Sequence, residues 1–172
     1  RGKNISIREL FNDMSNHPCP RPGNVIFQRY QQGAKCLAAY KKEEFSGCLW
    51  YVKRQYMEDE VRCLFKLESD KSVWDFDVYV EPKYRLSPVF LKLWDDASQK
   101  LLAEGYLHSI SRISAFNAMS LSSHKRMGAK PLGWAVFLCA GFIQLTVTNL
   151  SPFFHISFNT KSFPVFNFKT KS

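Results

Sequence analysis

Residues 74–85 read Trp74-Asp75-Phe76-Asp77-Val78-Tyr79-Val80-Glu81-Pro82-Lys83-Tyr84-Arg85. Polar and apolar side chains alternate through the first part of this stretch, which predicts a strand over Val73 to Val80. From Pro88 to Glu104 the apolar residues recur every three or four positions, which predicts a helix. Ser87 suits its N-cap, Pro88 its first position and Gly105 its end. The stretch therefore predicts a strand that leads into a helix N-terminus, a structure that can bind phosphate.

A second strand and helix are predicted downstream. Ser109 to Phe116 has the character of a strand, and Asn117 can cap a helix that ends at Gly128. Right-handed crossover favours a parallel return of this strand beside Val73 to Val80. Three further strands are predicted after the helix: Leu132 to Ala140, Phe142 to Thr148 and Phe153 to Phe158.

Closely spaced strands are predicted before residue 74. They are Val25 to Tyr30, Lys35 to Lys41, Gly47 to Lys53 and Val61 to Leu67, and their short turns indicate antiparallel pairing. In front of them, the spacing of Ile7, Leu10, Phe11 and Met14 predicts a short amphipathic helix followed by a proline-rich loop. We expect a mixed α/β (α+β) fold, with a mostly antiparallel central sheet flanked by helices. The expected divisions are an N-terminal helix and loop (1–24), a main domain (25–158) and a C-terminal extension (159–172).

The composition fits a globular chain of 172 residues, with 45% hydrophobic and 23% charged residues. The net charge is +9, but the basic residues are dispersed and no nucleic-acid motif is present, so nucleic acid is not expected as a partner. The longest apolar stretch, 132–150, is interrupted by polar residues and glycines, so no membrane span is expected.

Five cysteines are scattered along the chain: Cys19, Cys36, Cys48, Cys63 and Cys139. Their odd number and the absence of C-x-x-C predict free thiols and a reducing, cytoplasmic location. The four histidines are equally scattered, so no metal site is expected. The chain opens at Arg1 without a charged-then-apolar leader, from which we expect a truncated start and no secretory signal.

The second helix carries Asn117-Ala118-Met119-Ser120-Leu121-Ser122-Ser123-His124-Lys125-Arg126-Met127-Gly128-Ala129. With this segment, the chain resembles the Gcn5-related N-acetyltransferases over about residues 35 to 150. These proteins pair a strand ending in V-x-P-x-[YF]-[RQ] with a later N-x-x-A-x-x-x-Y-x-x-x-G-[FA]. Asn117, Ser120, His124 and Gly128 stand at the spacings of that later motif. A more distant resemblance is to the N-acyl amino acid synthases.

The resemblance implies a thioester donor, acetyl-CoA or another acyl-CoA. The residues that it assigns to this cofactor are Val78, Tyr79, Val80, Arg85, Leu86, Ser87, Val89, Phe90 and Asn117. The family's phosphate loop, [QR]-x-x-G-x-[GA], has glycine and a small residue where Pro88 and Phe90 stand. Pro88 has no N–H to donate, so this loop suits one phosphate better than a pyrophosphate. The phosphopantetheine of an acyl carrier protein, with a long acyl chain, is therefore an alternative donor, and the +9 surface would attract such an acidic protein.

Three residues are candidates for catalysis under this resemblance. His124 stands where the family has a tyrosine that protonates the departing thiolate, a task that an imidazolium can perform. The alternative is a surface histidine that stabilises the C-terminal end of its helix. Asp75 and Asp77 are expected on one face of their strand, where either could be the base for the amine. The alternative is a polar strand face paired with neighbouring Arg or Lys.

The strand from Ser109 to Phe116 is expected to diverge from its neighbour and to hold the pantetheine arm through Ser111, Arg112 and Ser114, unless Arg112 is simply a surface residue. The implied reaction is acyl transfer, acetyl by default, from a CoA thioester to a primary amine by direct attack. The acceptor would be a small molecule or a peptide. A domain of this fold that binds a ligand without catalysis is the alternative, and the oligomeric state is left open.

Overall fold

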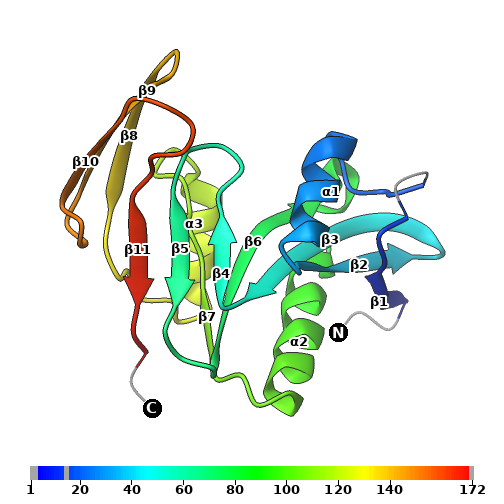
Figure 1. Cartoon of the computed structure of the whole chain (residues 1–172). Coiled ribbons are helices and arrows are strands. Elements are labelled where there is room, and N and C mark those ends of the chain that lie inside the picture. Colours follow the sequence, from blue (N-terminus) through cyan, green and yellow to red (C-terminus); the bar gives the residue numbers. More distant parts are fainter. Residues whose placement is uncertain (1–3, 14–15, 171–172) are drawn as a thin grey trace.

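The computed structural model describes residues 4–13 and 16–170, and its main feature is a five-stranded sheet (Figure 1). The strands follow the order β1-β2-β3-β6-β7, antiparallel except for the parallel β6–β7 pair. Their bounds are β1 Ile5–Leu10, β2 Lys35–Lys41, β3 Glu44–Lys53, β6 Ser72–Val80 and β7 His108–Ile110. The predicted central strand and its parallel neighbour are confirmed, although β7 stops well before Phe116.

Two three-stranded sheets complete the fold. One has the order β11-β5-β4 and the other the order β10-β9-β8. Their bounds are β4 Gln55–Met57, β5 Leu64–Leu67 and β11 Val165–Phe168, and β8 Ala135–Ala140, β9 Ile143–Thr148 and β10 Phe154–Ser157. Strand β11 pairs in parallel with β5 and buries Phe166 in the core. The expected extension 159–172 thus contributes a core strand, whereas the domain limits themselves remain a prediction.

Helices α1 (Gly23–Gln31) and α2 (Val89–Ala103) cover opposite faces of the central sheet. Helix α1 buries Ile26 in a cluster with Cys36 and Trp50, whereas α2 buries a stripe spaced by four residues against Leu37 and Leu49. Neighbouring residues of a strand point to opposite faces, so these two clusters lie on the two sides of β2 and β3. A short 3-10 turn, η1 (Pro82–Tyr84), and helix α3 (Ala118–Arg126) are the remaining helical elements of the described residues.

Two sequence predictions of secondary structure are wrong. Residues 25–30, predicted as a strand, form most of α1, because Ile26, Arg29 and Tyr30 follow a helical spacing that buries one face. The predicted N-terminal helix is instead strand β1, which pairs with β2 along its whole length. Pairing with a neighbouring strand overrides the weak local preference there. Met14, which belonged to that prediction, lies outside the described residues.

Among the described residues, no helix has the length and apolar character needed to cross a membrane.

Candidate active site

Strand β6 contains a bulge at the edge of the candidate site. Phe76 pairs with Trp50 and Tyr79 with Cys48, so two residues of β6 stand opposite one residue of β3. Asp77, one of the two, has a φ of +48°, a left-handed conformation that Asp tolerates better than most residues. Bulges of this kind bend a strand and redirect its side chains.

The bulge reverses the faces of β6. Before it, Trp74 and Phe76 pack in the cluster on the α1 side, and after it, Val78 and Val80 pack on the α2 side. The prediction that these four residues share one face is therefore wrong. The prediction that Asp75 and Asp77 share the other face is wrong for the same reason, because the bulge lies between them.

A cavity opens where β6 and β7 separate. Their pairing ends at Trp74 and Ile110, and beyond this point lies a cavity of about 460 Å³. Residues 75–79 of β6 line one side of it, and residues 111–114 with parts of α3 line another. The predicted divergence of the two strands is thus observed, but residues 111–114 form a loop rather than a strand.

Asp75 is a buried carboxylate in this cavity, with 3% of its surface exposed. Burial raises its pKa to about 6, while the hydrogen bond from Ser109 and the nearby His124 act in the opposite direction. The Ser109 hydroxyl donates to Asp75 Oδ1 at 2.6 Å. A carboxylate of this kind can accept a proton near neutral pH.

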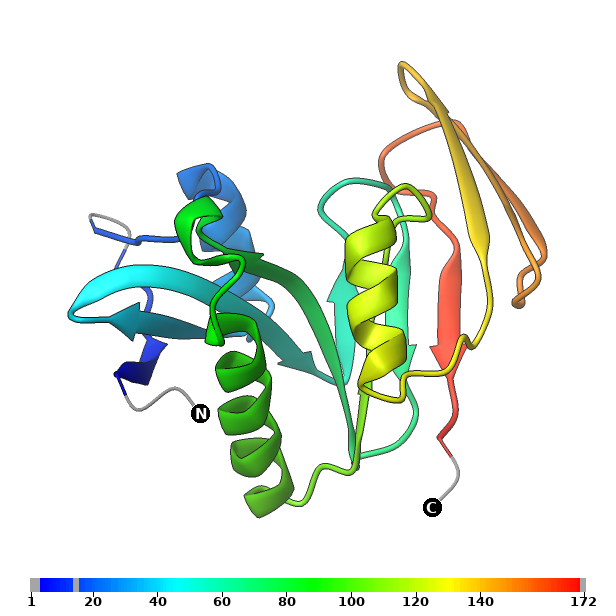
Figure 2. The ribbon, with the colours of Figure 1, turned by 180° about the vertical axis from the view of Figure 1, so that it is seen from behind.

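His124 lies on α3 and is 8% exposed, so the surface-helix interpretation is wrong. Its Nδ1 lies 2.8 Å from the carbonyl oxygen of Ser120. Because a carbonyl only accepts, Nδ1 carries hydrogen, and Nε2 is left for proton exchange. In Figure 2, α2 and α3 both lie on the near side of the molecule. The His124 ring makes edge contacts with Phe90 and Trp94 of α2.

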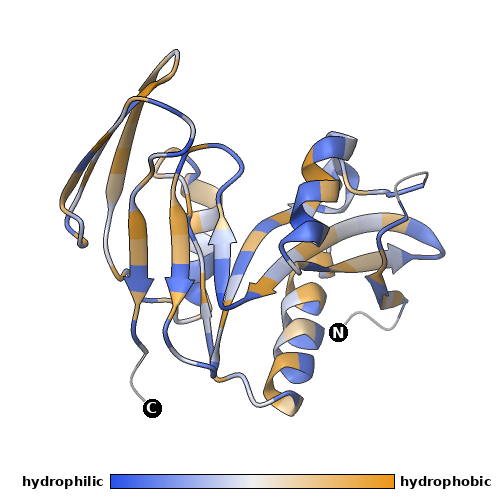
Figure 3. Cartoon of the chain, in the orientation of Figure 1, coloured by the Kyte–Doolittle hydropathy of each residue, from blue (hydrophilic) through white to orange (hydrophobic). Residues whose placement is uncertain are grey.

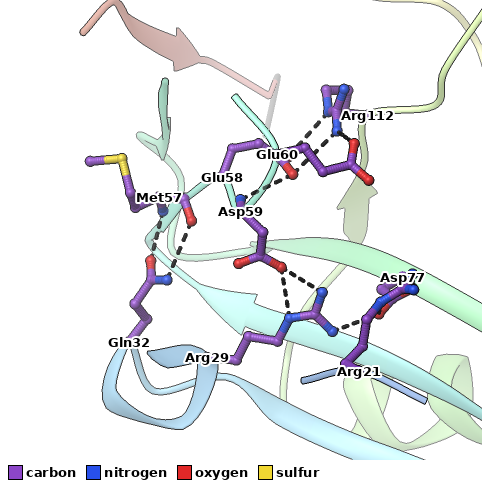
Figure 4. A network of polar contacts seen from close by, with 9 residues as sticks. All are labelled: Arg21, Arg29, Gln32, Met57, Glu58, Asp59, Glu60, Asp77 and Arg112. Carbon is purple, nitrogen blue, oxygen red and sulfur yellow. Dashed lines mark hydrogen bonds and ion pairs between the residues drawn. The ribbon is translucent and has the colours of Figure 1, made fainter. Parts of the chain in front are cut away.

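Asp77 belongs to an ion-pair network on the α1 side, shown in Figure 4. Arg29 Nη1 donates to Asp77 at 2.6 Å, Arg29 Nε donates to Asp59 at 2.8 Å, and Arg21 also binds Asp77. Arg29 is only 3% exposed, and these carboxylates raise its pKa against the effect of burial. Of the two interpretations of these carboxylates, pairing with a neighbouring arginine applies to Asp77, whereas Asp75 has no such ion pair among the described residues.

A second network closes the adjoining wall (Figure 4). Arg112 Nε donates to Glu58 at 3.1 Å, and the same guanidinium binds Glu60. Burial raises the pKa of Glu58, and Arg112 opposes this shift. Arg112 lines the cavity, so it is more than a surface residue.

The residues of the expected phosphate loop lie outside the cavity lining. Arg85 is exposed and donates to the Val80 carbonyl at 3.4 Å, Leu86 is fully exposed, and the Val89 side chain is buried in the α2 core cluster. Pro88, not Ser87, is the N-cap of α2, and Ser87 donates to the Tyr84 carbonyl instead. The start of the helix is thus displaced by one residue from the prediction.

Of the other residues assigned to the cofactor, Val78, Tyr79 and Asn117 line the cavity. Asn117 is the N-cap of α3, as predicted, and its Oδ1 accepts from the Ser120 N–H at 3.0 Å. Val80 lies beside Gly47 of β3 and is half-buried. Phe90 contacts His124 rather than the cavity.

Sequence reasoning missed the arginines and acids that line the α1 side of the cavity. Arg29 was hidden by the strand prediction for residues 25–30. The available signal was the spacing of Ile26, Arg29 and Tyr30, which is that of one helix face. This spacing places a charged residue among apolar ones on the buried side of the helix. Nothing comparable marked residues 58–60, which form a loop between β4 and β5.

No protein-family model and no curated protein matches this sequence. Among solved structures, an aminoglycoside acetyltransferase from an uncultured soil metagenomic sample, in complex with sisomicin, matches with a TM-score of 0.56 and 11% identity, covering 80% of this chain and 97% of that one. AAC(6')-Iy, in complex with a CoA bisubstrate analogue, matches with a TM-score of 0.58 and 15% identity, covering 79% and 97%. A ribosomal-protein-alanine N-acetyltransferase from Brucella melitensis matches with a TM-score of 0.55 and 13% identity, covering 79% of this chain and 98% of that one.

These similarities show the fold. The chain has the architecture of the Gcn5-related N-acetyltransferases, as the sequence predicts.

Proposed function

We propose that this chain is an N-acyltransferase that transfers an acyl group, acetyl by default, from a CoA thioester to a primary amine. The observation that carries the proposal is the cavity between β6 and α3, which holds the buried Asp75 and the inward-facing His124. Aminoglycoside acetyltransferases and a ribosomal-protein-alanine N-acetyltransferase share its fold, which supports an amine acceptor.

Asp75 is the proposed base. An amine is protonated near neutral pH and must lose a proton before it attacks the thioester carbonyl. With a pKa of about 6, Asp75 is ionised at pH 7 to 8 and can take that proton. Asp77 is the poorer candidate, because both of its oxygens are bound by arginines.

His124 is the proposed acid. As the C–N bond forms and the C–S bond breaks, the leaving thiolate needs a proton. With Nδ1 donating to the Ser120 carbonyl, an imidazolium would deliver this proton from Nε2. Backbone N–H groups of Val78 to Val80, beyond the end of the β7 pairing, are proposed to stabilise the oxyanion.

The charge of the cavity supports a cationic acceptor. Five carboxylates and three guanidinium groups line it, although the chain as a whole carries +9. This local acidity would attract an amine, whether on a small molecule or at a peptide terminus.

Acyl-CoA is the proposed donor, with the phosphopantetheine of an acyl carrier protein as the alternative. A protein of this fold is known in complex with a CoA bisubstrate analogue. Pro88 at the N-cap of α2 still removes one N–H from the expected phosphate site, which is the argument for a carrier. The five cysteines are free thiols, which fits a reducing cytoplasm, the location that we propose.

A thermal-shift panel with acetyl-CoA, a long-chain acyl-CoA and a holo-acyl carrier protein tests the proposal. A ligand that binds only the folded state adds about 2.7 kcal/mol of stability at 100 times its dissociation constant. The donor that raises Tm is then incubated with a panel of amines, and acylation is followed by mass spectrometry. If no thioester raises Tm, the alternative is favoured, namely a domain of this fold that binds another ligand without catalysis. If a carrier donor has the higher kcat/KM at low salt, the CoA assignment is wrong.

A further inference from the structure

Three of the five cysteines form a cluster on the α1 side of the central sheet. Cys19, Cys36 and Cys48 are 4%, 0% and 1% exposed, and the Sγ atoms of Cys19 and Cys36 lie 3.5 Å apart. Cys48 lies next to this pair, diagonally across β2 and β3 from Cys36. One ligand atom each from His17, Cys19 and Cys36 lie within 4.8 Å of one another. Side chains that are scattered in the sequence are thus close together in the fold, whereas the expectation of no metal site remains untested.

The sheet register brings two of these thiols together. Cys36 pairs with Trp50 and Cys48 pairs with Ala38, so the two cysteines are diagonal neighbours on one face of β2 and β3. Cys19 reaches them from the proline-rich loop before α1. A separation of 29 residues between Cys19 and Cys48 conceals this arrangement in the sequence.

His17 presents an unprotonated nitrogen. The Tyr30 hydroxyl donates to the Leu10 carbonyl at 3.3 Å, so the contact of 3.0 Å between this hydroxyl and His17 Nε2 has the imidazole as donor. Nδ1 is then the nitrogen with a lone pair, which here accepts from the Cys19 N–H at 3.4 Å and which a bound metal ion would take in its place. Trp50 stacks on the imidazole and holds its plane.

We propose that these three cysteines and His17 bind a structural zinc ion. Cys₃His is an established ligand set for structural zinc, and soft thiolates favour zinc over hard cations. A tetrahedral ion with Zn–S bonds of about 2.3 Å places its sulfur ligands about 3.8 Å apart, close to the observed 3.5 Å. The ion would also offset the charge of thiolates buried together, which is otherwise costly.

The ion would hold the loop that forms one wall of the cavity. Arg21 lies two residues after Cys19 and binds Asp77 at the bulge of β6. Zinc at Cys19 would therefore fix the position of Arg21, and through it the bulge. The zinc proposal itself does not depend on the proposed acyl transfer.

The test measures zinc in protein purified without chelators, by inductively coupled plasma mass spectrometry. We expect one zinc per chain, and a loss of most of it in Cys19→Ser, Cys36→Ser and Cys48→Ser. Cys63→Ser is the matched control, because Cys63 is also fully buried but is not one of the three proposed cysteine ligands, and it should keep the zinc. Wild-type protein stripped of zinc and given Co²⁺ should show a thiolate-to-cobalt charge-transfer band, a readout that needs no variant to fold.

Three results would overturn the proposal. The first is wild-type protein that lacks zinc even after incubation with zinc under reducing conditions and gives no cobalt band. The second is full zinc content in the Cys36→Ser and Cys48→Ser variants. The third is a Cys19–Cys36 disulfide in the purified protein, found by mass spectrometry without reductant.

An independent observation concerns the β10-β9-β8 sheet, whose polar face is buried and whose apolar face is exposed. On the buried face, Gln144, Thr146 and Ser157 are at most 1% exposed, and the Gln144 side chain is held by hydrogen bonds to the backbone of Arg62. The opposite face has two cross-strand rows of apolar residues: Val136, Val147 and Phe154, and Leu138, Leu145 and Ile156. Figure 3 shows that strand β8 of this sheet is mostly hydrophobic.

We infer that a second copy of this chain covers this apolar face. The six exposed apolar residues that share it are Val136, Leu138, Ile143, Val147, Phe154 and Ile156. A chain of net charge +9 repels its copies unless they meet where charge is absent, and residues 131–160 contain no Asp, Glu, Lys or Arg. The lack of charge gives an acidic partner or an anionic membrane nothing to attract it to this face. A two-fold axis would place the two flat apolar faces against each other.

Light scattering coupled to size-exclusion chromatography tests this inference on the whole chain. We expect a dimer at micromolar concentration, which Leu138→Lys and Ile156→Lys convert into a folded monomer with an unchanged circular dichroism spectrum. Leu102→Lys is the control, since Leu102 is as exposed as Leu138 but lies on α2, and it should leave the dimer intact. A wild-type monomer at all concentrations, a dimer that survives both substitutions, or a monomer that binds lipid vesicles through this face would overturn the inference.

Discussion

Ser109 of β7 donates a 2.6 Å hydrogen bond to Asp75 of β6, one residue beyond the last residue of β6 that pairs with β7. This bond ties the two strands together at the mouth of the cavity. It also acts on the carboxyl group itself, because it favours the ionised form while burial favours the neutral one.

The first prediction concerns the pH dependence of acyl transfer. If Asp75 is the base, kcat/KM rises with pH through about 6, the pKa of this group. Ser109→Ala removes a bond that lowers this pKa, so it should move the rise to higher pH. Asp75→Asn should lower kcat by roughly 10²–10⁴-fold and abolish the rise. If the increase of kcat/KM with pH is the same in Asp75→Asn as in wild type, the titrating group is not Asp75.

The second prediction concerns the free energy of unfolding, which should fall as pH rises, whereas activity should rise. Burial raises the pKa of Asp75 from 3.8 to about 6, so between these values the folded state binds more protons than the unfolded state. The contribution of Asp75 to the free energy of unfolding is fully present below pH 3.8 and is lost as pH rises through 6. At 1.36 kcal/mol per pKa unit, the loss is about 3 kcal/mol. Urea unfolding should show Asp75→Asn more stable than wild type at pH 8, with little difference near pH 4. An Asn variant less stable at pH 8 would contradict this.

The third prediction concerns His124. Replacement by alanine should lower kcat by roughly 10²–10⁴-fold if this residue protonates the thiolate, while the dissociation constant of the thioester stays nearly the same. Turnover is measured under conditions where chemistry is limiting, and Lys125→Ala, on the exposed side of the same helix, is the control. Equal turnover in both variants would leave His124 a packing residue between α3 and α2.

The fourth prediction separates Asp77 from Asp75. Asp77→Asn leaves the buried Arg29 with one carboxylate fewer, so we expect a loss of about 1–3 kcal/mol in unfolding free energy. Asn tolerates the positive φ at this position, so backbone strain is not added. Glu43→Gln is the matched control, because Glu43 also has a positive φ and pairs with Arg8, but in solvent, where the expected loss is at most about 1 kcal/mol. Chemical denaturation checks both, and equal losses would mean that the network contributes little.

The fifth prediction concerns Gly47 of β3, which pairs with Val80 just beyond the bulge. A Cβ atom at this position would lie 2.5 Å from the backbone oxygen of Tyr79, which cannot move without opening the β3–β6 pairing. Gly47→Ala should cost about 1–3 kcal/mol and lower activity by displacing the bulge. At Gly133 the atoms nearest to an added Cβ belong to the side chains of Leu150 and Asn149 rather than to the backbone of a paired strand, so Gly133→Ala should cost less. Comparable Tm values for Gly47→Ala and wild type would show that the strands adjust freely.

The sequence by itself determined the order of elements around the cavity. Strong local signals mark each of them: the alternation over residues 73–80, the helical spacing from residue 89, and Asn117 as the cap of α3. The resemblance to the Gcn5-related N-acetyltransferases, rather than these local signals, pointed to Asp75, Asp77 and His124 as candidate residues. Asp75 and His124 lie in the cavity because their elements occur in the predicted order.

Only the tertiary structure decided what those residues contact. A bulge depends on the register of two strands, so the alternation of residues 74–80 could not reveal that Asp75 and Asp77 face opposite sides. Arg29 meets Asp59 and Asp77 across 30 and 48 residues, and Cys19 meets Cys36 across 17. Local propensity describes neighbours within about one or two turns of chain, whereas ion pairs and thiol clusters form between segments that only the folded sheet brings together.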